Sequence, residues 1–285
     1  MCPSDQRATA FRDILKTPFP KTFMNRKSIF PVFAVGAMLA SLSSTATSQA
    51  TALPTTQAAA LPPAAGLLAK YGAAVGAPAL LKSVAVTTKG GLSMPAAGME
   101  ATFEMLQLAP SRMRMTTNIP GMGPIQVGYD GTIGWSMDPM QGPRLLAGKE
   151  FDQIRDEADP RTVARSAEML SAMQTVADTT MGGERCYLVK LNWKSGRETF
   201  DCFSPISGFM VGSKSVQQTA MGAVPVVTHY SAYKKFGELT MPTKTVLEVM
   251  GQQQILNITS VEVGTGAGLE IKAPPEIQAL IKPKT

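Results

Sequence analysis

Apolar and polar side chains alternate with a period of two along most of the sequence after residue 83, and this pattern limits the fold most strongly. The alternation is clearest at residues 103–105, 112–115 and 125–129. Successive side chains of a β-strand point to opposite faces, so the pattern is typical of strands with one buried face. Similar signals return from about residue 175 to residue 263. The sequence therefore predicts about ten strands in one large antiparallel sheet.

Helical spacing is limited to a few segments. Residues 64–75 place their larger apolar side chains on one side, as an amphipathic helix does. Residues 148–173 mix apolar side chains with many charges. We expect two short helices there, divided near Asp159-Pro160, because the residue before a proline disfavours the α conformation. The segment 273–281 is expected to end in a short helix. Helices packed on one face of the sheet would complete the core.

Residues 24–50 have the organisation of a cleavable secretory signal. A basic beginning is followed by the apolar residues 29–42 and by the small side chains around Ser48-Gln49-Ala50. The apolar run is 14 residues long, whereas a membrane-spanning helix needs roughly 20. A membrane anchor is the alternative interpretation. We expect cleavage after Ala50 and a mature chain in the periplasm or outside the cell, with no stable transmembrane anchor.

The signal divides the remaining sequence into parts. Met24 is the expected start, which makes residues 1–23 a non-native upstream extension. Residues 51–63 consist largely of small residues and prolines and indicate a disordered linker. Residues 64–285 are then expected to form a single domain, with its helical insertion at about 148–173.

The net charge of +6 belongs mainly to the amino-terminal segment. Residues 1–50 carry six Lys/Arg and two Asp/Glu, and the remaining chain carries 21 and 19. A nearly neutral domain lacks the field that captures a phosphate backbone. The charge distribution therefore argues against a nucleic-acid partner.

Cys186 and Cys202 remain after removal of the signal. An even number of cysteines in an exported chain favours a disulfide, and two buried free thiols are the alternative. A two-residue turn at Ser195-Gly196 would pair Val189 with Cys202 and would place the cysteines on opposite faces of the hairpin. A bulge, or a three-residue turn through 194–196, would restore a common face.

The sequence carries few of the groups that catalytic or metal sites need. His229 is the single histidine; it lies in an expected strand, and no G-x-S-x-G elbow accompanies it. No zinc pattern, P-loop or G-x-G-x-x-G is present. Acidic pairs such as Asp156 and Glu157 indicate a solvated helix surface. We expect no enzyme activity, no metal and no cofactor, although carboxylate pairs of the glycosidase type leave no sequence signature.

Methionine is the compositional oddity, because fifteen of the 18 methionines follow residue 50. Flexible thioether side chains suit surfaces that repack around varied apolar ligands. Ordinary filling of the core is an alternative. Binding of a soft metal such as Cu(I) is a second alternative, at the close pairs Met113/Met115 and Met137/Met140.

Several segments, in order along the chain, resemble the LolA/LolB-like superfamily, and especially its divergent exported members called outer-membrane lipoprotein-sorting proteins. The resemblance extends from about residue 67 to residue 274. Residues 128–135 (GYDGTIGW) are similar to the family's Asp-Gly-x-x-Gly-Trp hairpin. The other matching segments are residues 75–80, 146–150, 204–209 and 230–242. The resemblance implies a mostly β (α+β) fold, an incomplete antiparallel β-barrel whose concave face is covered by helices.

The resemblance and the strand pattern together suggest a non-enzymatic, monomeric periplasmic carrier. It would hold a lipid, a lipoprotein acyl chain or another apolar ligand in the half-barrel, beneath a mobile helical lid at 148–173. Strongly curved sheets with too little helix leave room for a ligand. The candidate lining residues alternate with polar positions on successive strands: Phe103, Met105, Met113, Met115, Ile125, Val127, Trp135, Val189, Leu191 and Phe200. The alternative is an exported interaction or assembly module of the cell envelope, in which the same residues form a solid core and envelope proteins are the partners.

Overall fold

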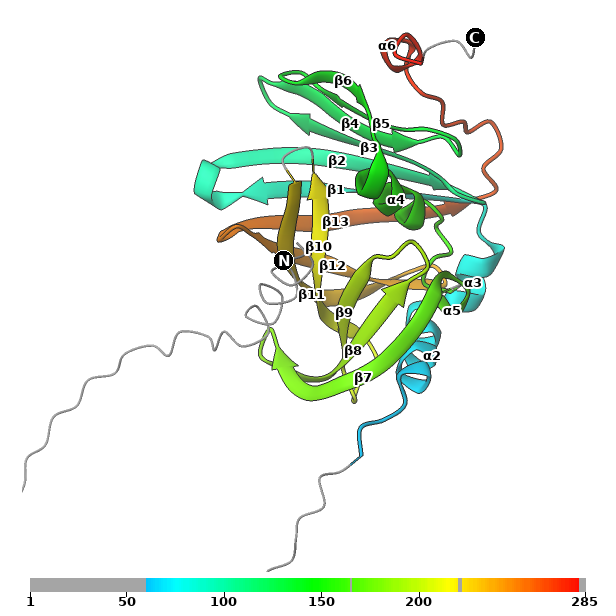
Figure 1. The fold of residues 1–285 in the computed structure, drawn as a ribbon, viewed down its shortest axis with the longest axis vertical. Helices are drawn as coiled ribbons and strands as arrows, with labels where there is room; N and C mark the ends of the chain where they lie inside the picture. The colour runs from blue at the N-terminus through cyan, green and yellow to red at the C-terminus, as the bar shows by residue number, and fades with distance from the viewer. Residues whose placement is uncertain (1–59, 165, 220–221, 282–285) are drawn as a thin grey trace, which may run out of the picture. The chain divides into compact units, whose positions relative to one another are not determined.

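The alternating segments form one antiparallel sheet of 13 strands in the computed structural model, which describes residues 60–281 except 165 and 220–221 (Figure 1). The strand order is β6-β5-β4-β3-β2-β1-β13-β12-β11-β10-β9-β8-β7. The order does not close, because β6 and β7 do not pair with each other in the described part of the chain. The prediction of a mostly β fold with an open, incompletely barrelled antiparallel sheet is confirmed.

The strands are connected by short turns, and the helices lie before, between and after them. The helices are α2 (Ala64–Val75), α3 (Ala77–Lys82), the 3-10 turn η1 (Pro95–Ala97), α4 (Gly148–Glu157), α5 (Ser166–Met169) and α6 (Pro275–Gln278). The strands are β1 (Ala85–Met94), β2 (Met99–Leu108), β3 (Arg112–Ile119), β4 (Gly123–Tyr129), β5 (Gly134–Asp138), β6 (Gly142–Leu145), β7 (Leu170–Met181), β8 (Glu184–Trp193), β9 (Glu198–Phe203), β10 (Met210–Thr219), β11 (Gly222–Phe236), β12 (Leu239–Val249) and β13 (Gln252–Gly264).

The last strand joins the two halves of the sheet. Consecutive strands pair as antiparallel neighbours, except β6 and β7, which are separated in the chain by α4 and α5. Strand β13 returns to β1, which pairs with β2 on its other side. The amino-terminal strands β1–β6 and the carboxyl-terminal strands β7–β13 therefore form one continuous surface.

One face of the sheet, called the inner face below, is covered by α4 and α2. Met105, Met115 and Val127 lie side by side on it, in β2, β3 and β4. Phe151 and Ile154 of α4 belong to the same apolar cluster as Met105 and Val127. Lys149 of α4 is exposed, but Asp156 of the same helix is buried, so the expectation that Asp156 and Glu157 lie on a solvated helix surface is wrong for Asp156.

Helix α2 packs on the inner face of the carboxyl-terminal half. Its Leu67 joins a buried cluster with Val189 and Leu191 of β8. The rings of Tyr71 and Phe203 lie with their centroids 5.3 Å apart. The predicted helix at residues 64–75 is confirmed, and its apolar side is the side that contacts the sheet.

The opposite, outer face of the amino-terminal half is covered by the end of the chain. Ile271, Ala273 and Ile277 pack against Trp135, whose side chain is fully buried, in a cluster with Leu106. The expected short helix near the carboxyl terminus is present as α6. Its role in covering the second face was not predicted, because no periodicity in the tail indicates where it docks.

The hairpin that contains the cysteines differs from the two-residue turn considered above. The N–H of Trp193 donates to the carbonyl of Arg197, with an N–O distance of 2.8 Å, so residues 194–196 form a three-residue loop. Gly196 has φ +84°, a conformation that such loops require and that glycine adopts without strain. Val189 consequently lies opposite Asp201 rather than Cys202.

This register brings the two cysteines to a common face. Cys202 lies opposite Leu188, and Cys186 is two residues from Leu188 on the same strand. The predicted disulfide between Cys186 and Cys202 is confirmed, with Cα atoms 5.4 Å apart. The bridge joins β8 to β9 next to Asp201, which precedes Cys202 in the chain.

The helical insertion is shorter than expected. Two helices, α4 and α5, are present and are separated by the segment that contains Pro160, as the sequence predicted. Strand β7 already begins at Leu170, so residues 170–173 belong to the sheet rather than to a lid. Met173 joins the cluster beneath α2, and this apolar contact favours the extended conformation there.

Candidate functional site

The residues predicted to line an apolar cavity lie on both faces of the sheet. Those on the inner face of β2–β4 are Phe103, Met105, Met113, Met115, Ile125 and Val127. Val189 and Leu191 lie on the inner face of β8 beneath α2. Trp135 and Phe200 lie on the outer face, at register positions opposite Gly128 and Lys190. None of the ten lines either cavity described next, so their part in ligand binding stays a prediction.

Two cavities of similar volume are prominent in the described part of the chain. One, of about 310 Å³, lies between α3 and the turn that joins β11 to β12. The other, of about 300 Å³, lies between α4 and strands β8–β12 and is called the inner cavity below. Small-molecule sites have volumes from about 300 to 1,000 Å³. The inner cavity is the candidate site because charged and hydroxyl side chains from several strands converge on it.

Hydroxyl side chains form a row across the floor of the inner cavity. Thr199 of β9 lies opposite Ser215 of β10, and Ser213 lies opposite Thr228 of β11. These residues belong to the same inner face as Val189, because Asp201 lies opposite both Val189 and Ser213. The alternation rule assigns such polar side chains to the solvent side, so the sequence did not indicate them as lining residues.

Apolar side chains complete the lining. They come from β8, β10, β11 and β12: Trp193, Met210, Val216, Val226 and Leu247. The indole N–H of Trp193 donates to the Thr199 hydroxyl at 3.2 Å, which fixes the ring beside the polar row. The cavity therefore offers both an apolar surface and a set of hydrogen-bond acceptors.

Asp201 is the carboxyl group on the floor of the cavity. Burial raises its pKa to about 7, while the positive charge of Arg197 and a hydrogen bond with the Thr199 hydroxyl act in the opposite direction. Burial disfavours the charged form of a carboxyl group in this way. Asp201 therefore changes its charge near neutral pH.

Two tyrosines near Asp201 stay neutral. Burial raises the pKa of Tyr230 to about 12, and its hydroxyl is hydrogen-bonded to Ser213 and Thr228. Burial also raises the pKa of Tyr71 well above its usual value, with a smaller contribution from the charge of Asp201. These phenols supply hydrogen-bonding groups, not charge, to the carboxyl-terminal half of the inner face.

Arg197 links the rim of the inner cavity to α4. Its Nη1 lies 2.6 Å from Oε1 of Glu157, and its Nε lies 3.7 Å from Oδ2 of Asp156. The guanidinium also stacks over the ring of Trp193, with Cζ 4.3 Å from the ring centroid. The hydroxyl of Ser195 donates to Asp156 at 2.6 Å. We call these contacts the latch, because they attach the end of α4 to the β8–β9 hairpin.

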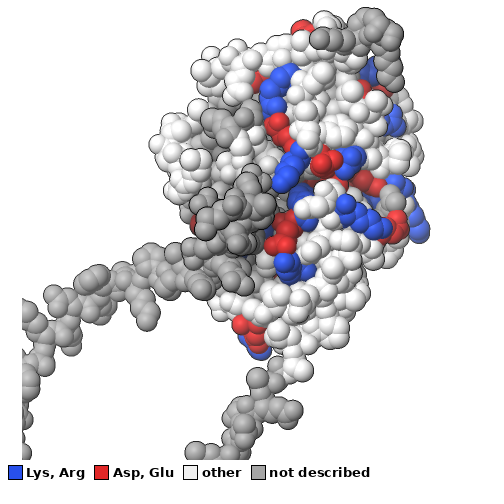
Figure 2. All heavy atoms as spheres, viewed as in Figure 1, with Lys and Arg blue, Asp and Glu red and all other residues white. Residues whose placement is uncertain are grey.

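Further polar contacts attach α4 to both halves of the sheet. Gln153 accepts a hydrogen bond from the backbone N–H of Gln218 in β10, at 3.0 Å. At the other end of the helix, Arg144 and Glu150 form a two-bond ion pair with distances of 2.8 and 2.6 Å. Side chains of both charges gather over the part of this face where α4 lies (Figure 2).

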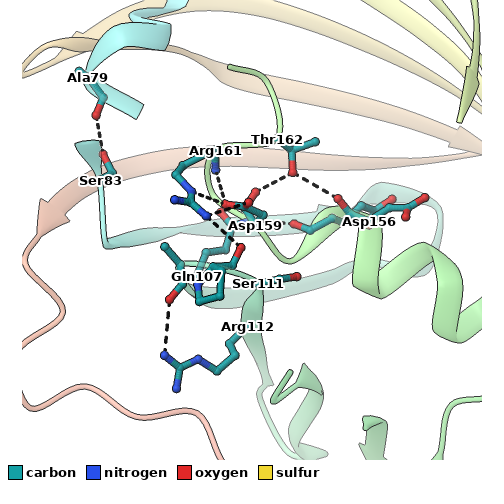
Figure 3. A network of polar contacts seen from close by, with 12 residues as sticks. Ala79, Ser83, Gln107, Ser111, Arg112, Asp156, Asp159, Arg161 and Thr162 are labelled. Atoms are coloured by element: carbon teal, nitrogen blue, oxygen red, sulfur yellow. Dashed lines mark hydrogen bonds and ion pairs between the residues drawn. The ribbon is translucent and has the colours of Figure 1, made fainter. Parts of the chain in front are cut away.

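The segment that follows α4 is fixed to the β2–β3 turn by a separate network (Figure 3). The Asp159 carboxylate accepts bonds from the backbone N–H and the Nε of Arg161, both at 2.9 Å. Gln107 donates to the carbonyl of Glu157 at 2.9 Å. Thr162 donates to the carbonyl of Asp159 at 2.7 Å. This network places the carboxyl end of α4 at a fixed position above the sheet.

The described residues show no grouping of three or more His, Cys, Asp or Glu side chains of the kind that holds a metal ion. His229 lies 3.7 Å from Glu248, on neighbouring strands. No helix within residues 60–281, gaps excepted, is long and apolar enough to cross a membrane. The predicted signal at residues 24–50 lies outside the described residues.

No family model and no curated protein sequence matches the chain. Several solved structures are similar. A LolA superfamily protein from Nitrosomonas europaea is 12% identical, with a TM-score of 0.49, over 76% of this chain and 97% of its own. A DUF1329 family protein from Desulfovibrio piger is 12% identical, with a TM-score of 0.47, over 72% of this chain and 95% of its own. The Mycobacterium tuberculosis lipoprotein LppX is 10% identical, with a TM-score of 0.27, over 68% and 94%.

At these identities and TM-scores the similarity assigns neither a family nor a function. The chain's own architecture is the more informative observation: an open antiparallel sheet of 13 strands with α2 and α4 on its inner face. This is the arrangement that the sequence analysis expected, an incomplete antiparallel barrel with helices on one face.

Proposed function

We propose that the domain is a non-enzymatic binding protein of the carrier type, which holds a ligand with an apolar chain between α4 and the inner face. The observation that supports this proposal is the inner cavity of about 300 Å³, which is lined by residues of α4 and five neighbouring strands and is open on one side. Apolar burial contributes about 25 cal/mol per Å², or about 0.8 kcal/mol for each buried CH₂. A short acyl or alkyl chain could therefore bind tightly against Trp193, Val226 and Leu247.

The proposed carrier works outside the cytoplasm, after removal of residues 1–50. The disulfide between Cys186 and Cys202 supports this, because structural disulfides persist mainly in oxidising compartments. The ligand would be a lipid or a lipoprotein acyl chain from the cell envelope, and the protein would act as a monomer.

Exchange of the ligand would require α4 to move. Its latch to Arg197 is polar: the Glu157 side chain is 47% exposed, whereas those of Arg197 and Asp156 are 17% and 10% exposed. The ion pair with the exposed Glu157 is sensitive to salt. Opening of the inner cavity would therefore require release of the latch together with the bond from Gln107 to the Glu157 carbonyl, which holds the same end of α4.

A second candidate function is supported by the amino-terminal half of the sheet. There the inner face is filled, because Met105 and Val127 pack with Phe151 of α4. Phe151 also contacts Tyr129 edge to face, with ring centroids 5.6 Å apart. In an interaction module with a solid core, packed side chains would fill the whole inner face in this way. The two candidate functions therefore differ in whether the inner cavity binds a ligand.

Adjacent positions of β11 provide a matched test. Val226 lines the inner cavity, and Val227, the next residue, points to the other face. Mature protein purified from its own host would be extracted with organic solvent, and the extract analysed by mass spectrometry. We expect a co-purifying lipid in the parent and in Val227→Phe, and its loss in Val226→Phe. Absence of lipid from the parent, together with failure of the refolded parent to bind alkyl probes, would support the interaction module instead.

A further inference from the structure

The charge at the inner cavity points to the head group of its ligand. The floor presents one carboxyl group, Asp201, among the hydroxyls of Thr199, Ser213, Thr228 and Tyr230. We infer that the cavity selects amphipathic ligands with a cationic primary ammonium head over those with an anionic head. This inference rests on the proposed function and specifies its ligand class.

The charges around the cavity disfavour an anionic head group. The charged lining residues are Asp201, Glu157 and Arg197. The guanidinium of Arg197 is already bound to Glu157 at 2.6 Å and lies near Asp156 at 3.7 Å. Its positive charge is therefore shared among the carboxylates of α4. A carboxylate or phosphate head group placed on the floor would face Asp201 without a cation of its own.

The hydrogen-bonding groups of the floor match an ammonium head. A primary ammonium group has three N–H donors and no acceptor. Ionised Asp201 is an acceptor, and each neighbouring hydroxyl oxygen can accept a further bond through its lone pairs. Tyr230 is held in place by Ser213 and Thr228, so these acceptors are positioned before a ligand arrives. An ammonium head there would satisfy every donor, with the alkyl chain against Trp193.

The overall charge of the mature chain does not favour cations. Beyond residue 50 the chain carries 21 Lys/Arg and 19 Asp/Glu, a net charge of +2, so its general field does not attract a cationic ligand. A preference for a cationic amphiphile would therefore come from the site itself and not from the overall charge. A measured preference for the cationic ligand would therefore report on the residues of the cavity floor.

The preference should depend on pH. Burial raises the pKa of Asp201 to about 7, so its carboxylate is largely ionised at pH 8 and largely protonated at pH 5.5. Among the groups that face it, Arg197 stays charged, and Tyr71 and Tyr230 stay neutral because their pKa values are raised. Alkylammonium groups, like lysine with a pKa of about 10.4, stay protonated throughout.

Glu157 is the other carboxyl group whose charge could contribute to this pH dependence. Partial desolvation of this half-exposed side chain raises its pKa, while the charge of Arg197 and the hydrogen bond between the two side chains act in the opposite direction. Replacement of Asp201 with Glu157 left in place therefore shows which of the two carboxyl groups causes the pH dependence of ligand binding. In Asp201→Asn the ammonium preference should be lost at every pH, whatever the charge of Glu157.

The test uses dodecylamine and dodecanoate, each below its micelle concentration, with delipidated protein and isothermal titration calorimetry. At pH 8 we expect dodecylamine to bind about 10- to 100-fold more tightly than dodecanoate, the range given by one charge-assisted hydrogen bond. The advantage should shrink at pH 5.5. Asp201→Asn should remove the advantage while alkyl binding persists. Asp178→Asn should leave it unchanged, because Asp178 of β7 pairs with Arg185 of β8 on the surface.

The outcomes separate the two proposals. Equal affinities, a preference for dodecanoate, or an ammonium preference that survives in Asp201→Asn would overturn the inference and leave the carrier proposal intact. Binding of neither probe would overturn both. Circular dichroism of each variant would show that it is folded, and Ser213→Ala, which removes one acceptor and keeps the carboxylate, should lower the ammonium preference only partly.

Discussion

Gly128 of β4 is placed so that a single methyl group tests the packing of the outer face. It lies opposite Trp135 of β5, and a Cβ at this position would overlap the fully buried indole ring. Replacement by alanine forces the ring or the strand to move, and overpacking of this kind costs about 1–3 kcal/mol. Alanine in a strand is itself about 0.5–1 kcal/mol more favourable than glycine. We expect a net loss of about 1–2 kcal/mol in the free energy of unfolding.

The same substitution at Gly66 is the matched control. Gly66 lies in α2 and is exposed, and a methyl group added there would meet no atom within 4 Å beyond its own stretch of helix. Alanine there should stabilise the helix by up to about 1 kcal/mol. Thermal unfolding should therefore show opposite signs: Tm falls by about 2–8 °C for Gly128→Ala and rises by up to about 4 °C for Gly66→Ala.

A double-mutant cycle identifies the cause of the loss. Trp135→Phe alone should destabilise by leaving a cavity, but it should cost less in the Gly128→Ala background, where the smaller ring relieves the overlap. A Gly128→Ala variant as stable as the parent, or strictly additive effects of the two changes, would refute the packing of Trp135 over Gly128 and with it the register of β4 and β5.

Three further predictions concern the carboxyl-terminal half. Reduction of the disulfide between Cys186 and Cys202, which are 16 residues apart, should lower the free energy of unfolding by about 3 kcal/mol. Urea titrations with and without reductant would measure this, and equal midpoints would contradict it. Arg197→Met should speed amide exchange in α4 by up to about fivefold, and unchanged exchange would show that the latch does not restrain the helix. Asp201→Asn should stabilise the ligand-free protein at pH 8 and should reduce the dependence of its stability on pH between 4 and 7. The folded-state pKa of Asp201, about 7, exceeds the unfolded value, so the stability of the parent falls as the pH rises through this interval.

The architecture could be predicted from the sequence because it rests on local patterns. Alternating side chains indicated the strands, helical spacing indicated the helix at residues 64–75, and the hairpin-like residues 128–135 marked the turn between β4 and β5. The pairing of Cys186 with Cys202 followed from export and an even count. Each of these depends on residues that are close in the chain or on composition.

The faces of particular strands could not be predicted in this way. One residue more or less in a turn moves a whole strand's side chains to the other face. The three-residue loop at 194–196 placed Phe200 on the outer face and Asp201 on the inner one. Trp135 faces outward and is buried all the same, because the distant tail residue Ile277 covers it.

The candidate site was missed for a related reason. Its polar residues, such as Ser213 and Thr228, alternate with their neighbours as solvent-facing residues do, although they face the interior of the half-barrel. The apolar residues chosen from the pattern, such as Met105 and Val127, are instead packed against α4. Only the three-dimensional position of α4 shows which part of the inner face is filled and which is open.

Ligand binding beneath α4 is tested most directly by the fluorescence of Trp193 during titration with dodecylamine. The chain has two tryptophans: Trp193 lines the inner cavity, whereas Trp135 is buried on the outer face and should give a constant background. We predict a saturable change in emission with one ligand per chain, absent in Trp193→Phe and in the cavity-filling variant Val226→Phe. A titration without saturation, or a response unaffected by Val226→Phe, would contradict binding beneath α4.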